Sequence, residues 1–462
     1  MRDLGQIIKA YDVRGVYPDQ LDAELAHRVG AAFARVVGAA RSAGGPGAVV
    51  VGRDMRPSGP ELVAAFCQGV TEQGVDVVDI GLASTDLLYF AAGRLSLPGA
   101  MFTASHNPAR YNGIKMCRAG ATPVGQDTGL ADIRAIVAEP VAPADGPIGT
   151  VSHRDLLADY ADFLHELVDL SAIRPLRVVV DAGNGMAGHT APAVLGVAAL
   201  QVVPLYFELD GTFPNHEANP IDPDNLRDLQ AAVRSEGADI GLAFDGDADR
   251  CFVVDERGEP VSPSALTGLI AVRELARHPG SAIIHNLITS AAVPEVIVEN
   301  GGVPVRTRVG HSFIKAVMAE TGAVFGGEHS GHFYFADFWR ADSGMLAALH
   351  TIAALGGSPQ GTTLSTLLAP YERYVASGEI NSVVSDTALA TARVRDAFAD
   401  EPGASFDDLD GMTVSGPGWW FNVRPSNTEP LLRLNAEAGD AESMSALRDR
   451  VLSLIRDGSQ VR

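Results

Sequence analysis

The stretch AVVVGRDMRPSGPELVAAFCQGVTEQGVDVVDIG, residues 48–81, decides the fold class. An aliphatic run is followed by a short loop, a segment with apolar residues at helical spacing, and a second apolar run at 75–80. An uninterrupted apolar strand is typical of a parallel strand covered on both faces, so the stretch predicts a β-α-β unit. Ser58, with Glu61 three residues later, predicts a capping box at the start of its helix.

The same plan recurs in LRVVVDAGNGMAGHTAPAVLGVAALQVVPLYF (176–207) and SAIIHNLITSAAVPEVIVENGGVPVRTRVG (281–310). The recurrence predicts three related α/β domains in series. Near the C-terminus, WWFNV (419–423) and LLRLNAEA (431–438) predict two strands, and residues 443–457 predict a helix, so the last domain is of the α+β type. The fold class is therefore α/β, with four domains that we place at 1–150, 151–256, 257–365 and 366–462.

Composition and charge narrow the class of protein. The chain has 462 residues, 46% of them hydrophobic, and a net charge of −22, which opposes binding to nucleic acid or to an anionic membrane surface. The N-terminus lacks a signal-peptide pattern, and no apolar stretch is long enough to span a bilayer. Three widely spaced cysteines (Cys67, Cys117 and Cys251) argue against a disulfide framework. We expect a cytoplasmic protein, either a monomer or a weak homodimer.

The motif DGDADR, residues 245–250, predicts a metal site. Asp245, Asp247 and Asp249 alternate with small residues, so a curled loop can aim three hard oxygen ligands at one divalent cation. An EF-hand would also place Glu256 at its twelfth position, but Arg250 stands where that loop needs glycine, and the flanks read as strands. Three carboxylates leave positions for water or a phosphate oxygen, which favours Mg²⁺ over Ca²⁺. A solvated acidic turn remains the alternative.

Three polar loops accompany the acidic one. TASHNP (103–108) presents Ser105 without the GxSxG elbow of a hydrolase, and a plain turn serine is the alternative interpretation. GEHSGH (327–332) offers a carboxylate, a hydroxyl and imidazoles suited to sugar hydroxyls and proton transfer. RPSNTE (424–429) combines a guanidinium fork with short hydrogen-bonding side chains and suits a phosphate. Together the loops predict phosphoryl transfer on a phosphosugar.

These motifs, with KAYDVRG (9–15), YNGIK (111–115) and GHSFIK (310–315), resemble those of the α-D-phosphohexomutases, in the same order and over essentially the whole chain. The likeness is to the bacterial phosphomannomutase/phosphoglucomutase group. It implies a heart-shaped, four-domain protein with its active site where the domains meet. It also implies that a phosphoryl group on Ser105 passes to a hexose 1-phosphate, giving a hexose 1,6-bisphosphate that returns its other phosphate and also serves as activator.

The resemblance implies a role for each matching residue. Mg²⁺ would be held by Ser105, Asp245, Asp247 and Asp249. Arg14, Lys115 and Arg250 would stabilise charge, Lys115 and His332 would move protons, and His106 would support the serine loop. Substrate would contact His311, Glu328, Ser330, Arg424, Ser426, Asn427 and Thr428.

Specificity follows partly from Glu328. One carboxylate that accepts hydrogen bonds from the 3- and 4-hydroxyls cannot easily distinguish mannose from glucose, so the resemblance implies action on both. Asn427 departs from the glycine of phosphoglucosamine mutases, and Leu287 and His329 depart from residues common in bifunctional relatives. The alternatives are a phosphoglucosamine mutase, a non-catalytic phosphosugar-binding protein, and an acidic Ca²⁺-binding structural protein.

Overall fold

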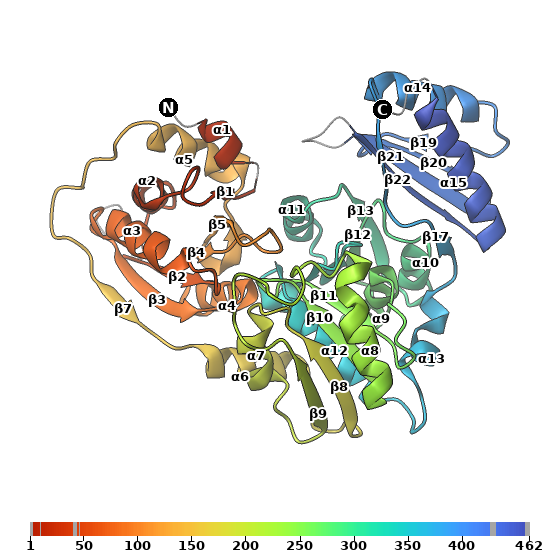
Figure 1. Ribbon diagram of the computed structural model, residues 1–462, viewed down its shortest axis with the longest axis horizontal. Helices are drawn as coiled ribbons and strands as arrows, with labels where there is room; N and C mark the ends of the chain where they lie inside the picture. Colours follow the sequence, from red (N-terminus) through yellow and green to blue (C-terminus); the bar gives the residue numbers. More distant parts are fainter. Residues whose placement is uncertain (1–2, 10, 40–43, 46, 426–430, 458–462) are drawn as a thin grey trace.

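The computed structural model describes residues 3–9, 11–39, 44–45, 47–425 and 431–457. Within these residues the strands form four sheets that follow one another along the chain. Figure 1 shows the corresponding four lobes, from the red and orange N-terminal lobe to the blue C-terminal one. The prediction of a four-domain α/β fold is confirmed.

The first sheet has the strand order β1-β5-β4-β2-β3-β7, with β6 paired to β5. Its strands are β1 (Val13–Val16), β2 (Ala48–Arg53), β3 (Asp76–Leu82), β4 (Gly99–Phe102), β5 (Tyr111–Arg118), β6 (Thr122–Pro123) and β7 (Val151–His153). The helices of this region are α1 (Leu4–Ile7), α2 (Ala23–Val36), α3 (Gly59–Thr71), α4 (Thr85–Leu95) and α5 (Leu130–Val137). Strands β2 and β3 are parallel, as the β-α-β pattern predicts.

Both faces of strand β2 are buried, which explains its uninterrupted apolar run. Val49 and Val51 pack in one core with helices α2 and α3, whereas Val50 packs in another with helix α4. Side chains alternate across a strand, so both faces need apolar residues. The capping box at α3 is wrong: Ser58 caps no backbone N–H but accepts from Asn112, and the Glu61 carboxylate accepts from the Tyr17 hydroxyl.

The second and third sheets are built on the other two repeats, and their β8–β9 and β12–β13 pairs are parallel. The second sheet, ordered β11-β10-β8-β9, contains β8 (Leu176–Asp181), β9 (Leu200–Leu205), β10 (Ile240–Phe244) and β11 (Cys251–Val254), with α6 (Leu157–Leu167), α7 (Ala187–Val194) and α8 (Arg227–Glu236). The third sheet, ordered β13-β12-β14-β15-β16, contains β12 (Ala282–Asn286), β13 (Val303–Thr307), β14 (Phe325–Gly327), β15 (Phe333–Phe335) and β16 (Ala341–Asp342). Its helices are α9 (Pro263–Arg277), α10 (Ala292–Glu299), α11 (His311–Thr321), α12 (Gly344–Gly356) and α13 (Leu364–Leu368).

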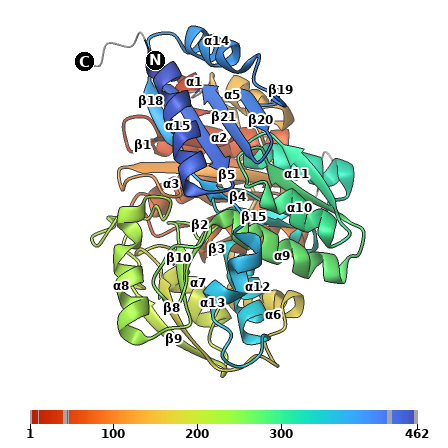
Figure 2. The same ribbon diagram turned by 90° about the vertical axis from the view of Figure 1, so that its right-hand side faces the viewer.

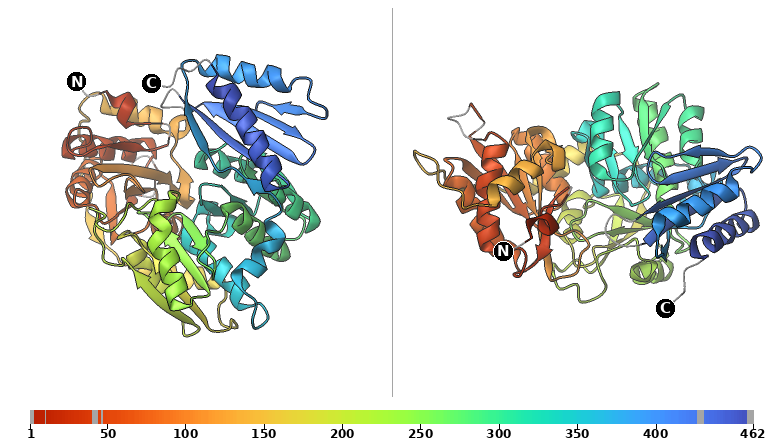
Figure 3. Two further views of the ribbon diagram at one scale, coloured as in Figure 1. Left: turned by 45° about the vertical axis from the view of Figure 1, so that its right-hand side comes forward. Right: turned by 90° about the horizontal axis from the view of Figure 1, so that it is seen from above.

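The fourth sheet is antiparallel and has the order β17-β22-β21-β20-β19, with β18 paired to β22. Its elements are β17 (Val375–Ala376), β18 (Ile380–Val383), β19 (Ser405–Asp407), β20 (Met412–Gly416), β21 (Trp419–Pro425), β22 (Leu431–Ala438), α14 (Thr387–Phe398) and α15 (Ala441–Arg456). Helices α14 and α15 cover one face of this sheet (Figures 2 and 3). The two strands and the C-terminal helix predicted here are confirmed.

The first three sheets share one apolar core, whereas the fourth has its own. The shared core joins Phe90 of α4, Leu164 of α6, Leu242 of β10 and Leu349 of α12. Shared burial of apolar surface ties the first three domains firmly together. The core of the fourth domain is a separate cluster that includes Phe398 and Leu434. Within the described part of the chain, no helix has the length and apolar character needed to cross a membrane.

Candidate active site

Ser105 lies in the loop between β4 and β5 with its side chain aimed at the second domain. Its φ is +49°, a left-handed conformation that non-glycine residues rarely adopt. The backbone N–H donates to Thr103 Oγ1 at 2.9 Å, and the hydroxyl donates to Asp245 Oδ2 at 2.7 Å. Because the residue is only 5% exposed, its oxygen meets the second domain in a protected site.

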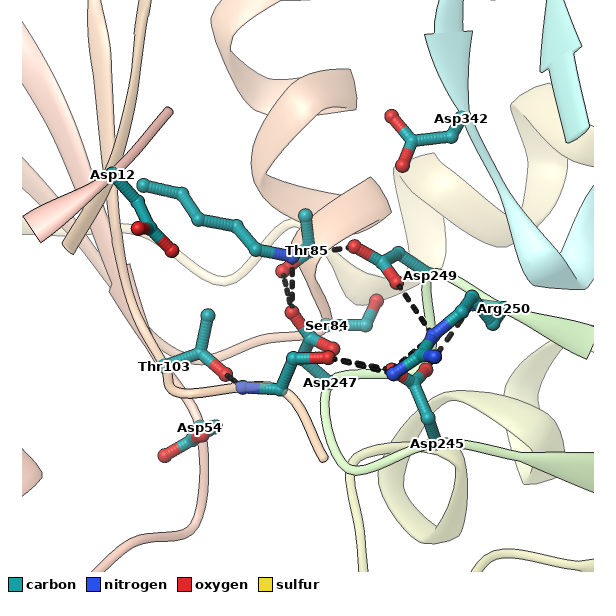
Figure 4. A network of polar contacts seen from close by, with 12 residues as sticks. Asp12, Asp54, Ser84, Thr85, Thr103, Asp245, Asp247, Asp249, Arg250 and Asp342 are labelled. Atoms are coloured by element: carbon teal, nitrogen blue, oxygen red, sulfur yellow. Dashed lines mark hydrogen bonds and ion pairs between the residues drawn. The ribbon is translucent and has the colours of Figure 1, made fainter. Parts of the chain in front are cut away.

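The three aspartates lie together in the loop between β10 and β11 (Figure 4). One carboxylate oxygen each from Asp245, Asp247 and Asp249 lies within 4.8 Å of the others, and all three residues are buried. Gly246 permits the approach of the serine loop, since a Cβ there would lie 2.5 Å from the Ser105 carbonyl oxygen. The fold therefore brings the serine and the acidic motif, 140 residues apart, into direct contact.

This loop has the properties of a cation site. The Oδ1 atoms of Asp247 and Asp249 are buried without a hydrogen-bond partner. Burial, opposed by Arg250 and reinforced by the two neighbouring carboxylates, raises the pKa of Asp245 to about 7. A hard divalent cation would satisfy the unpaired oxygens and relieve the repulsion among the carboxylates. The residues present thus fit such an ion.

The EF-hand interpretation is excluded by the same region. The acidic loop connects two antiparallel strands, β10 and β11, where an EF-hand has helices. Glu256 is also committed elsewhere, since its carboxylate accepts from the N–H of Ser365 at 3.0 Å and from the Ser365 hydroxyl at 2.5 Å.

Lys115, on β5, faces the acidic loop from the first domain. Its Nζ lies 2.7 Å from Asp247 Oδ2 and 2.5 Å from Asp249 Oδ2. Burial disfavours the ammonium form, but these two carboxylates outweigh it and hold the Lys115 pKa well above its ordinary value. Burial likewise opposes ionisation of Asp247, yet Lys115 and the Thr85 hydroxyl, 2.6 Å away, keep its pKa low. Lys115 therefore remains a cation beside the serine.

Two arginines complete the positive charge around Ser105. Arg250 donates from Nε to Asp245 Oδ2 at 2.9 Å and from Nη2 to Ser105 Oγ at 3.1 Å, and it also contacts His106 Nδ1. Burial, followed by the Arg250 charge, lowers the His106 pKa to about 2, so this imidazole stays neutral. Arg14, on β1, donates to Asn107 Oδ1 at 2.6 Å and to Asp12 at 2.5 Å.

His332 approaches the acidic loop from the third domain. Its Nδ1 lies 3.1 Å from Asp342 Oδ2 and 3.7 Å from Asp249 Oδ1. Burial lowers the His332 pKa, but Asp249 and Asp342 outweigh it, so the net direction is upward. Asp342 itself pairs with Lys315 Nζ at 2.6 Å.

A cavity of about 130 Å³ lies where these groups meet. Residues of three domains line it, namely Tyr11, Asp12, Arg14, Tyr89, Ser105, His106, Lys115, Met116, Pro123, Asp249, Arg250, His332 and Asp342. The structure thus brings together Ser105, Arg14, Lys115, Arg250 and His332, the five residues that the sequence singled out for catalysis.

Glu328 and Ser330, the candidates for sugar binding, are not among the residues that line this cavity. Glu328 follows β14 and is buried, and its carboxylate accepts from the Tyr334 hydroxyl at 2.8 Å and from Gly310 N–H at 3.2 Å. A third donor, the Asn286 side-chain amide, lies 3.4 Å from the Glu328 carboxylate. A carboxylate has about four lone-pair positions, so Glu328 can accept a further hydrogen bond. Ser330 is half-buried in the same loop.

The phosphate-binding candidates lie on the fourth domain. Arg424 at the end of β21 pairs through Nη2 with Glu379 Oε2 at 3.0 Å, and Arg433 on β22 pairs through Nη1 with Glu379 Oε1 at 3.2 Å. One carboxylate thus holds two guanidinium groups. Ser426, Asn427 and Thr428 lie outside the described residues. His311 begins helix α11, but its side chain is not among those that the structure describes.

Sequence reasoning missed four charged residues of this region. Asp54 and Arg56 are completely buried beneath the serine loop, Asp342 contacts His332, and Glu379 pairs with Arg424. A usable signal existed only for the first pair, because RDMR places charges directly after a buried strand.

Comparison with known proteins agrees with this site. Domains I, II and III (alpha/beta/alpha) and the C-terminal domain of the phosphoglucomutase/phosphomannomutase family match residues 5–142, 158–258, 263–374 and 379–454. The chain belongs to this family, as its motifs predict, and is a mutase of the phosphotransferase type.

Relatives match over nearly their whole lengths. The chain is 39% identical over 460 residues to the phosphomannomutase of Escherichia coli, with 97% of this chain and 98% of the relative covered. It is 39% identical over 447 residues to the phosphomannomutase/phosphoglucomutase of Pseudomonas aeruginosa, with 96% and 94% covered. A crystal structure of a family protein from Burkholderia thailandensis superposes with a TM-score of 0.87 at 35% identity, covering 100% of this chain and 99% of that one.

Proposed function

We propose that this protein is a Mg²⁺-dependent phosphomannomutase that also acts as a phosphoglucomutase, interconverting hexose 1-phosphate and hexose 6-phosphate. The observation that carries the proposal is the 2.7 Å contact between Ser105 Oγ and Asp245 Oδ2 at the edge of a buried three-carboxylate loop. A hydroxyl that contacts a carboxylate of a possible cation site suits a residue that carries a phosphoryl group better than a serine that only forms a turn. The names of the relatives, phosphomannomutase and phosphomannomutase/phosphoglucomutase, support the same substrates.

The proposed reaction uses Ser105 as the carrier of a phosphoryl group. Transfer breaks the bond between Ser105 Oγ and phosphorus and forms a bond between phosphorus and a hydroxyl oxygen of the hexose phosphate. Mg²⁺, held by Asp245, Asp247, Asp249 and the phosphorylated Ser105, would supply Lewis-acid stabilisation of the transferring group. Arg250, Lys115 and Arg14 surround the serine and stabilise the same charge.

The sugar hydroxyl must lose its proton as it attacks. Lys115 and His332 both line the cavity with Ser105 and are the two candidates to accept that proton. The Nδ1 contact of His332 with Asp342 orients its ring for this role. His106, neutral against Arg250, supports the serine loop.

The remaining residues bind the substrate. Glu328 and Ser330 accept hydrogen bonds from sugar hydroxyls, and we assign His311 to substrate binding as well. Arg424, Ser426, Asn427 and Thr428 hold the phosphate remote from the reaction. A hexose 1,6-bisphosphate formed at Ser105 then presents either phosphate to this clamp, so the two isomers share one site.

The proposal also covers the activator, the partners, the cellular location and the oligomeric state. Hexose 1,6-bisphosphate serves as activator by phosphorylating Ser105, and phosphosugars are the partners. We propose a cytoplasmic enzyme that is monomeric or weakly dimeric. The buried, unpaired state of Cys67, Cys117 and Cys251 is compatible with a reducing compartment.

Phosphorus NMR tests the proposal directly. Purified protein with Mg²⁺ and a trace of glucose 1,6-bisphosphate receives mannose 1-phosphate, glucose 1-phosphate or glucosamine 1-phosphate in separate samples. We expect the phosphate to move to C6 of mannose and glucose. Movement for glucosamine alone would indicate a phosphoglucosamine mutase, and no movement for any sugar would indicate a phosphosugar-binding protein.

A further inference from the structure

Arg56 holds the backbone of the serine loop from below. Its Nη2 donates to the carbonyl oxygens of Ser105 at 2.8 Å and Asn107 at 2.7 Å. Its Nη1 donates to the carbonyl oxygens of Pro108 at 2.9 Å and Tyr111 at 3.0 Å. Four carbonyl groups of residues 105–111 thus converge on one guanidinium that is 0% exposed.

Asp54 fixes this guanidinium and the start of the loop. Asp54 Oδ2 accepts from Arg56 Nε at 3.2 Å, and Oδ1 accepts from the Arg56 backbone N–H at 2.9 Å. Thr103 lies near Asp54 (Figure 4), and Thr103 Oγ1 accepts from Ser105 N–H at 2.9 Å. Figure 4 shows Thr103 and Asp54 on the same side of the acidic loop, with Asp54 below Thr103.

The second domain covers the outer side of Arg56. The ring of Phe213 lies 5.2 Å from the guanidinium carbon, within the range of a cation–π contact. Gly211 packs so closely that a Cβ there would lie 2.7 Å from Arg56 Cα. Arg56 is therefore sealed away from the cavity, and any effect it has on the reaction must pass through the loop that it holds.

The conformation of Ser105 explains why the loop needs such support. A non-glycine residue at positive φ costs roughly 1–3 kcal/mol and persists only where its surroundings fix it. Four inward-facing carbonyls would also be costly without donors. A planar fork with five N–H groups meets all of them at once, whereas a lysine ammonium has three donors on one atom.

We propose that Asp54 and Arg56, called here the Asp54–Arg56 brace, position Ser105 for phosphoryl transfer. The inference rests on the proposed function, since it assumes that Ser105 carries the phosphoryl group. Both are positioning residues, and neither touches the substrate. Their loss should therefore slow transfer without weakening the binding of the phosphosugar.

Arg56→Lys tests the brace by keeping the charge and removing the fork. We expect kcat to fall about 10- to 100-fold, the loss typical of a displacement near 1 Å at a reacting group. We expect KM to stay within about threefold of wild type, because the contacts of the bound substrate remain. A rapid-quench single turnover from phosphorylated Ser105 to glucose 1-phosphate should slow by the same factor as kcat.

Arg118→Lys is the matched control. Arg118 lies in the same domain and also donates to two backbone carbonyls, those of Val36 and Thr128, but away from the serine loop. We expect it to leave kcat and KM unchanged. Wild type and Ser105→Ala are measured in the same series, so absence of turnover in wild type would reject the proposed function rather than the brace.

Asp54→Asn keeps the proposal testable if Arg56→Lys does not fold. It retains an acceptor for Arg56 but removes the charge, so we expect a smaller fall in kcat at unchanged KM. The double variant should be no slower than Arg56→Lys alone, because the two residues act through one loop. An unchanged kcat in the folded variants, or a loss confined to KM, would overturn the proposal.

Discussion

The proposed transfer centre around Ser105 and the proposed phosphate clamp on the fourth domain differ in how their charges are paired. Near Ser105 the buried cations have several partners each: Lys115 contacts two carboxylates, and Arg250 contacts Asp245 and Ser105. In the clamp, two partly exposed arginines share the single carboxylate of Glu379. The side chains around Ser105 therefore have more charged partners than Arg424 has, which suits a proposed transfer centre at the first place and a proposed reversible phosphate clamp at the second.

The apolar cores of the domains also differ between these two regions. The domains that form the transfer centre share one apolar core, but the fourth domain has a separate one. Its contacts with the third domain include polar ones, such as Arg306 with Asp407, Val309 N–H with Asp410 at 3.2 Å, and Ala291 N–H with Glu437 at 2.9 Å. Polar interfaces of this kind permit relative movement of domains more readily than a shared apolar core does.

The largest effect should come from Ser105→Ala, which removes the proposed carrier from the rigid centre. We expect turnover to fall by at least about a thousandfold, because no other group replaces a lost nucleophile. The dissociation constant for glucose 1-phosphate, measured by calorimetry, should stay close to that of wild type. Turnover near the wild-type rate would show that Ser105 is not the carrier.

Asp247→Asn breaks the cation site of the same centre. We expect Mg²⁺ affinity to fall by more than about 100-fold. Substituting a residue that only hydrogen-bonds to a metal ligand already lowers metal affinity by about 10- to 100-fold. Mn²⁺ titration followed by electron paramagnetic resonance measures this without requiring activity. Glu256→Gln, at the position an EF-hand would use, is the control and should bind the ion as wild type does. A loss of ion binding in the control instead would contradict the assignment of the acidic loop.

Arg424→Ala removes a guanidinium group from the proposed phosphate clamp. A hydrogen bond to a charged group contributes about 1.5–3 kcal/mol, so we expect KM to rise about 10- to 100-fold. The rise should be similar for hexose 1-phosphate and hexose 6-phosphate, because each presents its phosphate to the same arginine. Steady-state assays in both directions measure it. An effect on one isomer alone would mean that the two do not share a clamp.

Glu379→Gln should have the smallest effect and the opposite sign. Partly exposed ion pairs contribute about 0.2–1 kcal/mol, so loss of the carboxylate charge beside the two arginines should lower KM by about 1.4- to fivefold. Glu299→Gln, which breaks a surface pair with Arg373, is the control and should leave KM unchanged. A higher KM in Glu379→Gln would show that the carboxylate positions the arginines rather than competing with the phosphate.

The local parts of this molecule could be predicted from sequence. The β-α-β units follow from apolar periodicity, and the strand-loop-strand around Asp245 follows from spacing within ten residues. Ser105 could be singled out from its motif, but its contact with Asp245 depends on how two domains meet.

The parts that sequence did not predict are pairings between distant or competing side chains. Arg56 reaches carbonyls about 50 residues away, and Glu379 pairs with Arg424 across 45 residues. The failed capping box has the same cause, because Asn112 and Tyr17 take the groups that Ser58 and Glu61 would have offered to the helix. A pattern within one segment cannot show which hydrogen bond forms when a competing partner lies far away in the sequence.

Transfer of label from glucose 1,6-bisphosphate to the protein tests most directly whether Ser105 carries the phosphoryl group. Wild type is incubated with Mg²⁺ and the ³²P-labelled bisphosphate, digested, and mapped by peptide sequencing. We expect one labelled residue per chain, Ser105, and loss of that label when mannose 1-phosphate or glucose 1-phosphate is added. Label on another residue, or label on Ser105 that neither sugar removes, would contradict this role.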